Sequence, residues 1–473
     1  MKRTWKPRWV VENRTPTFIS PRPGHVKFGA VKYLWGNVPA IDVIQLGQNE
    51  GAEFQTPINL LFAASGDLRN IVLSVTSLPQ SYRSPLSIVI NDCDIDIVAR
   101  NLIFLLIMFI EKDSNTAAEF MLHVWYSALV TEACYTLLQK KLKPLIEDVC
   151  NKIAGKPSRT LLGKTWHFGG SSLRLVLTRE AWIRLPSYFN VPNGMTKKKA
   201  HAVRQAVVNP PLAGLGMIKY RNCGVLLPFG QPCEAFVIPN PTVFNSCDEW
   251  PMMDSADPSD GWSIKTFLAT KAGPAKKDMY GQLHHYLKRL FTKFHCYLHS
   301  KPVSFELQHV YAQVLEETLA GKKFDRIEIS NICDSNYLGI DITLRTLGPL
   351  LRSPSANRHA TLITTFLNAV PEARMVFRMT EPFAAGLITK YMDRYDFAHA
   401  ASSAGLKMKE EHTIIPAWPL RVNDSLHPAQ KDREDFKLLL GTAHIGHERY
   451  MEWKVGAVRV AADTQLGGSC ILS

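Results

Sequence analysis

Two segments near the start of the chain each combine a short apolar run with an apolar helical pattern. The first run spans residues 57–64 and ends in Ser65-Gly66-Asp67, and a helical pattern begins near residue 71. The second spans residues 85–90 and ends in Asn91-Asp92-Cys93-Asp94, before a helical pattern that includes the apolar run 102–110. This order is typical of a parallel sheet with crossover helices. Ligands of such sheets bind beyond the carboxyl ends of the strands, so the two polar turns outline a candidate pocket.

The same pattern returns late in the chain. Residues 324–334 form a third apolar run that ends in polar residues, followed by a predicted helix over 340–351 and a predicted strand over 360–366. Apolar spacing of three and four residues predicts helices over 115–150 and 279–320. Shorter strands are predicted at residues 173–178, 225–227 and 235–238.

These patterns predict an α/β fold, a Rossmann-like and mostly parallel sheet interrupted by a large, mainly helical insertion. The predicted boundaries are a basic N-terminal arm at 1–32, the first part of the α/β domain at 33–114, the insertion at 115–320, the second part of the domain at 321–460, and a flexible tail at 461–473.

Composition and charge narrow the class of protein. Of 473 residues, 46% are hydrophobic and 21% charged, which suits a globular chain with a large core. Its longest apolar run is too short to span a bilayer. The net charge is +13, and more than half of this surplus lies in the first 35 residues. The basic arm has three possible interpretations: a solvated segment, a mitochondrial import signal, or a segment that contacts an acidic partner or membrane lipid.

Cysteine and histidine usage predicts a reduced, metal-free protein. There are nine cysteines and no Cys-x-x-Cys pair, which argues against a disulfide framework or a zinc knuckle and favours the cytoplasm. His284, His285, His295 and His299 are predicted on the surface of an amphipathic helix, and no metal is expected. Nucleic acid is not an expected partner, since no binding motif accompanies the lysines at 197–199.

The first polar turn offers a candidate ligand site at Ser65, Gly66 and Asp67. Glycine permits a tight turn and close approach of a ligand to the backbone, and free amides at the next helix start can hold an anionic or polar group. The alternative is structural: Gly66 only turns the chain, and Asp67 caps the following helix.

Two further clusters complete this candidate cofactor site. An acidic residue about 20 positions after a glycine turn often binds ribose hydroxyls, which assigns that role to Asp92 and Asp94. Capping of the next helix by either carboxylate is the alternative. Asn331 and Asp334 follow the third apolar run and face the same crevice if all three strands share one sheet. No residue is assigned as a catalytic base.

The last four residues, Cys470-Ile-Leu-Ser473, match a C-a-a-X box whose terminal serine favours farnesylation of Cys470. One prenyl group holds a membrane weakly, so a second signal is expected, and the basic arm is a candidate for it. An unmodified tail is the alternative. The prediction is therefore peripheral association with a cytoplasmic membrane face.

Four short segments carry a family resemblance: residues 33–51, 64–70, 91–94 and 99–101. They resemble a domain of unknown function that forms the front of dynein axonemal assembly factor 3 and occurs in many fungal proteins, some with MYND zinc fingers. The similarity covers residues 33–110 and extends loosely to 324–366. It implies a class I methyltransferase-like fold and S-adenosylmethionine as the candidate cofactor. The chain lacks the MYND cysteines, and its first turn has a single glycine.

The leading hypothesis is therefore a binding or assembly factor with a nucleotide-type crevice, a protein partner and a farnesylated C-terminus. An S-adenosylmethionine-dependent methyltransferase is the alternative.

Overall fold

The computed structural model describes residues 32–207, 215–248, 250–252, 256–273, 277–368, 372, 392–415 and 449–456. The basic arm, apart from Lys32, and the whole tail with Cys470 lie outside these residues.

Within the described residues, nine strands form one sheet in the order β10-β11-β9-β8-β1-β2-β7-β5-β4. The parallel strands are β9 (Thr361–Phe366), β8 (Arg326–Glu328), β1 (Ile58–Phe62), β2 (Leu86–Asp92), β7 (Val303–His309) and β5 (Ser171–Thr178). Antiparallel pairs add β4 (Leu161–Phe168) at one edge, and β11 (Arg449–Val455) with β10 (Leu406–Met408) at the other. The predicted α/β class and mostly parallel sheet are confirmed.

The central strands are apolar throughout because both of their faces are covered. Side chains alternate across a strand, and the two faces of β1 enter different cores. Leu60 and Phe62 belong to the larger core, whereas Leu61 belongs to the smaller one. In β2, Ile88 enters the larger core and Val89 the smaller. Because both faces are buried, the central strands of this sheet require continuous apolar runs.

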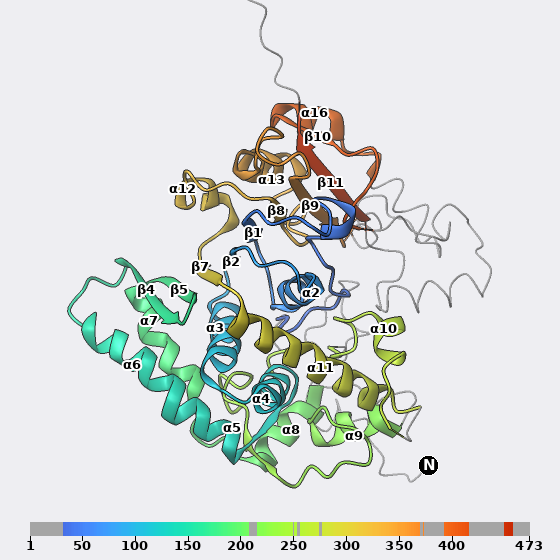
Figure 1. Cartoon of the computed structure of the whole chain (residues 1–473). Coiled ribbons are helices and arrows are strands. Elements are labelled where there is room, and N and C mark those ends of the chain that lie inside the picture. The colour runs from blue at the N-terminus through green and yellow to red at the C-terminus, as the bar shows by residue number, and fades with distance from the viewer. Residues whose placement is uncertain are drawn as a thin grey trace, which may run out of the picture.

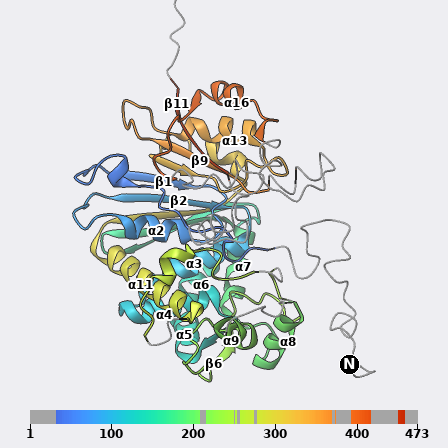
Figure 2. The same cartoon turned by 90° about the vertical axis from the view of Figure 1, so that its right-hand side faces the viewer.

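Helices cover both faces of the sheet (Figures 1 and 2). The larger layer is built around α2 (Arg69–Ser77), α3 (Ile95–Ile110), α4 (Ser114–Tyr126) and α11 (Met279–Ser300). The opposite layer contains α12 (Leu315–Thr318), α13 (Ile340–Leu347) and α16 (Phe397–Ser403). None of the helices that the structure describes is both long and apolar enough to cross a membrane.

The segment 115–320, predicted as a mainly helical insertion, supplies β4, β5 and β7 to the main sheet. It also holds a small sheet in which β3 (Leu129–Thr131) pairs with β6 (Phe236–Pro239). Its other helices are α5 (Glu132–Leu137), α6 (Lys143–Lys152), α7 (Arg179–Arg184), α8 (Lys197–Val207), α9 (Leu215–Cys223) and α10 (Ile264–Leu268).

Three local predictions in this segment are wrong. The helix predicted over 279–320 ends at Ser300, and β7 follows it, because the Val303–His309 run pairs with β2 on one side and β5 on the other. Residues 225–227 form a buried irregular segment and not a strand. His284 and His295 are also buried, at 2% and 4% exposure, since α11 packs between neighbours instead of lying on the surface.

Candidate functional site

The three predicted turns lie at one edge of the sheet. β1 pairs in parallel with β2 and with β8, so the carboxyl ends of these three strands point the same way. The crossover after β1 uses α2 on the larger layer, and the crossover after β8 uses α13 on the smaller one. The boundary between β1 and β8 is therefore a topological switch point, the position at which open α/β sheets form a crevice.

The turn after β1 is fastened to the turn after β2. Gly66 has a φ of +57°, and its backbone N–H donates to Asp92 Oδ2 at 3.0 Å. Asp92 Oδ1 accepts the N–H of Asp94 at 2.9 Å. The Ser65 N–H donates to the Asn91 carbonyl at 2.9 Å. Burial raises the pKa of Asp92 to about 6, although the hydrogen bonds from the Gly66 and Asp94 amides oppose this shift. The Asp92 carboxylate thus serves the chain's own backbone.

Asp67 fastens the same turn to the segment that precedes β1. Its Oδ2 accepts the N–H of Gly36 at 2.8 Å, and its Oδ1 pairs with Arg69 Nη1 at 2.8 Å. Oδ1 also accepts the N–H of Arg69, the first residue of α2, at 3.2 Å. The Ser65 hydroxyl donates to the Gly66 carbonyl at 3.2 Å. Asp67 is 4% exposed, and both of its carboxylate oxygens accept hydrogen bonds.

Asp94 is the N-cap of α3. Its side chain accepts the N–H of Asp96 at 2.8 Å and lies 3.1 Å from Lys32 Nζ. The capping alternative is thus the geometry observed for Asp94. About one third of the Asp94 side chain stays exposed, so it is the most accessible carboxylate of this cluster.

Asn331 and Asp334 join the end of β8 to the end of β9. Asn331 Nδ2 donates to Asp334 Oδ2 at 3.2 Å. The same oxygen accepts the N–H groups of Leu367 and Asn368 at 3.2 and 2.9 Å. Burial raises the pKa of Asp334 to about 6. The hydrogen bonds of Asp334 run toward the loop after β9.

A second polar centre at this edge was not predicted from the sequence. Asp96, 3% exposed, pairs with Arg184 Nη2 at 2.6 Å and accepts from Asn245 Nδ2 at 2.9 Å. The Tyr188 hydroxyl and Lys32 Nζ also bind it. Burial raises the pKa of Asp96, but these partners outweigh burial and lower it overall. An acid in the first turn of a helix looks like a dipole partner in sequence, and nothing in its spacing identifies Arg184 or Asn245.

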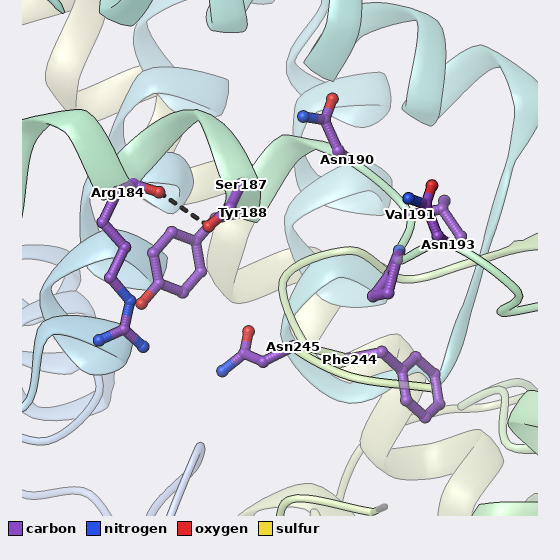
Figure 3. A pocket seen from close by; sticks show the side chains of 9 residues that line it. Arg184, Ser187, Tyr188, Asn190, Val191, Asn193, Phe244 and Asn245 are labelled. Carbon is purple, nitrogen blue, oxygen red and sulfur yellow. Dashed lines mark hydrogen bonds between the residues drawn. The ribbon is translucent and has the colours of Figure 1, made fainter. Parts of the chain in front are cut away.

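A pocket of about 360 Å³ opens beside this centre (Figure 3). Arg184, Tyr188 and Asn245 form the wall next to Asp96, and Asn190 and Asn193 supply further amides. About half of the Arg184 side chain is exposed. The lining therefore offers hydrogen-bond donors and one cation, which suits a polar or anionic group.

Tyrosine side chains flank the same edge of the sheet. Tyr311 follows β7, and Tyr337 follows β8. Tyr33 precedes the first strand and neighbours Lys32, which binds the start of α3. They are 70%, 59% and 45% exposed, respectively. Isolated tyrosines in loops carry no periodic pattern, so the sequence does not single them out.

Part of the chain that builds this edge matches a family model. Residues 34–130 match DUF4470, a domain of unknown function. The DUF4470 segment runs from the Gly36 contact through β1, β2, α3 and α4, so it contains the Gly66, Asp92 and Asp94 cluster and Asp96. Asn331, Asp334 and the pocket residues Arg184 and Asn245 lie outside it. No curated protein and no solved structure matches the chain.

Proposed function

We propose that this protein is a cytoplasmic binding or assembly factor that engages a protein partner at the carboxyl edge of its sheet. Support comes first from the polar residues of that edge. Gly66, Asp67 and Asp92 already form hydrogen bonds within the protein. Gly66 and Asp92 bind each other, and the two carboxylates also bind other backbone N–H groups and Arg69. A nucleotide or S-adenosylmethionine would have to displace these contacts. These hydrogen bonds hold the loops at the carboxyl edge in one conformation, which suits recognition of a protein partner.

The exposed tyrosines carry the second part of the proposal. Tyrosine combines a large apolar ring with a polar tip at low conformational cost, and it is enriched at protein interfaces. Tyr33, Tyr311 and Tyr337 present such groups at the edge where the loops are braced. The single glycine of the first turn and the lack of an assigned catalytic base favour a binding or assembly role over catalysis.

Affinity capture with variants of the full chain tests this proposal. Tyr311→Ser combined with Tyr337→Ser removes two exposed rings without touching the cores. The matched control is Phe229→Ser, because Phe229 is an aromatic residue, 46% exposed, in a turn between α9 and β6 outside the main sheet. The chain is expressed in the cell that makes it, and captured proteins are quantified by mass spectrometry. We expect one partner to be recovered with wild type and the control, and lost with the double variant. Equal recovery with all three chains contradicts the proposal.

A Rossmann-like S-adenosylmethionine-dependent methyltransferase is the second candidate function. The observation that favours it is the Gly66 turn, where a side chain would meet open space and a ligand can approach the backbone at the switch point. Calorimetry with S-adenosylmethionine separates the candidates. The methyltransferase requires binding that Asp92→Ala or Asp94→Ala abolishes while circular dichroism stays unchanged. The binding factor shows no such affinity.

Farnesylation of Cys470 would bring this factor to a cytoplasmic membrane face. The support is the C-a-a-X sequence alone, and the basic arm would supply the second membrane signal. Fractionation of cells that express wild type or Cys470→Ser tests the lipid. We expect wild type to distribute between membrane and cytosol, and the variant to be cytosolic. Deletion of residues 1–31 should weaken membrane recovery further, because anionic lipid attracts basic segments.

A further inference from the structure

A buried cluster of three potential metal ligands joins α4 to α11, away from the edge discussed above. Glu119 and His123 stand one turn apart on α4, and His284 faces them from α11, the neighbouring helix in Figure 1. One ligand atom from each residue lies within 4.8 Å of the other two. His123 and His284 are each 2% exposed.

His284 is the observation that calls for a ligand. Neither of its ring nitrogens has a hydrogen-bond partner, although both are buried. Its Nε2 lies 3.6 Å from Glu119 Oε1, beyond hydrogen-bond distance. Leaving a buried polar group unpaired is costly, and native structures rarely do so without a reason. A cation between the two side chains would give the His284 nitrogen and the Glu119 oxygen a shared partner.

The spacing of the ligand atoms agrees with tetrahedral coordination. Zinc bonds to histidine nitrogen and carboxylate oxygen at about 2.0–2.2 Å, which separates neighbouring ligand atoms by roughly 3.3 Å. The observed separations from Glu119 Oε1 are 3.0 Å to His123 Nε2 and 3.6 Å to His284 Nε2. A metal ion therefore fits with small side-chain adjustments.

Neighbouring groups would hold these ligands in place. His123 Nδ1 lies 2.9 Å from Ser127 Oγ, so the second ring nitrogen has the outer partner that metal-bound histidines use. Lys288 Nζ lies 2.7 Å from Glu119 Oε2 and leaves Oε1 for the metal. About 30% of the Glu119 side chain is exposed, so an ion can reach this residue from solvent.

We infer that Glu119, His123 and His284 form a zinc site with a water molecule as the fourth ligand. Two imidazoles and one carboxylate are a ligand set that zinc accepts, and a carboxylate-only preference such as that of magnesium does not match it. The inference does not depend on the proposed binding role, because the site lies between helices and not at the carboxyl edge.

Metal titration of the full chain tests the site. Protein stripped with a chelator is titrated with zinc chloride by calorimetry, and with cobalt chloride while visible absorption is recorded. Wild type should bind one ion per chain, and cobalt should give the intense bands of a tetrahedral ion. His284→Gln and Glu119→Gln should each weaken binding by at least about tenfold, because each removes a ligand. His285→Gln, the same change one residue along the helix, should bind as wild type does.

Several results would overturn the assignment. Wild type that takes up neither ion is one, and variants that bind as tightly as wild type are another. Equal weakening by His285→Gln would indicate adventitious binding by surface histidines. If His284→Gln fails to fold, Glu119→Gln decides the matter, since its side chain is partly exposed and keeps its shape.

Discussion

Asp92 Oδ2 accepts the backbone N–H of Gly66 at 3.0 Å, and this bond joins the turns that follow two neighbouring parallel strands. The amide involved is the one that a bound phosphate or carboxylate would use at a glycine turn. Because a side chain of the same protein accepts this N–H, the amide is hydrogen-bonded without a ligand and the two turns are held together rigidly. The relationship therefore connects the stability of the edge to the proposed binding role.

Replacement of Asp92 by asparagine should destabilise the fold. The carboxylate accepts two backbone N–H groups, those of Gly66 and Asp94, whereas an asparagine side chain offers one oxygen and places an NH₂ group against the second donor. We expect a loss of about 1–3 kcal/mol in the free energy of unfolding, measured by urea denaturation. Asp94→Asn is the control, because asparagine caps helices as well as aspartate does and should cost less. A loss for Asp92→Asn that is no larger than the loss for Asp94→Asn would contradict the prediction.

Glu328 at the end of β8 should make stability fall as pH rises. Burial raises the pKa of Glu328 from 4.5 to about 7, and the Ser330 N–H opposes this shift only in part. The unfolded chain ionises first, so the stabilising contribution is complete below about pH 4.5 and is lost as pH rises through about 7. A shift of this size corresponds to about 3 kcal/mol.

Glu328→Gln isolates this effect. Glutamine keeps the shape and cannot ionise. Relative to wild type, the free energy of unfolding of the variant should therefore rise by about 3 kcal/mol as the pH is raised from about 4.5 to about 8. Urea denaturation at both pH values measures the difference, and pairwise comparison cancels the other acids. Glu306→Gln on β7 is the control, because Lys322 and Gln308 overcome burial and lower the pKa of Glu306. A constant gap between wild type and Glu328→Gln would contradict the prediction.

Arg326 on β8 should not tolerate lysine. Its guanidinium, 1% exposed, donates to the carbonyls of Val43 and Ile44 at 3.1 and 2.9 Å, and pairs with Glu50 Oε2 at 2.7 Å. A lysine ammonium lacks the planar fork that reaches all of these groups. We expect Arg326→Lys to lower the denaturation free energy by about 3–5 kcal/mol, as when buried ion pairs are broken. Arg352→Lys, at a partly exposed ion pair with Asp325, should cost about 1 kcal/mol or less.

Gly36 should be intolerant of even one methyl group. A Cβ at this position would stand 1.3 Å from Arg69 Nη1, and that guanidinium is held by Asp67 and by the Val38 carbonyl. Alanine must therefore break the Asp67–Arg69 pair or move the loop, at a cost of about 1–3 kcal/mol. Thermal unfolding of Gly36→Ala measures it. Gly47→Ala is the control, because its added Cβ meets nothing within 4 Å and should leave the midpoint nearly unchanged.

The sequence by itself determined the local units of this protein. The strand–turn–helix order of β1 to α2 and of β2 to α3, the late strand β9, and the mostly parallel sheet all follow from periodicity and turn residues within about 20 positions. The adjacency of the Gly66 and Asp92 turns also follows, since parallel neighbours end at one edge. Such features are encoded by residues that are neighbours in the chain.

Only the tertiary structure decided how distant segments meet. It inserted β7 between β2 and β5, gave Asp96 the partners Arg184 and Asn245, and brought His284 against Glu119 and His123. The reason is that long-range pairing depends on the apolar area buried by the whole chain, and many placements share the same local pattern. A histidine on an amphipathic helix therefore looks exposed in sequence, until the packing of a second helix covers it.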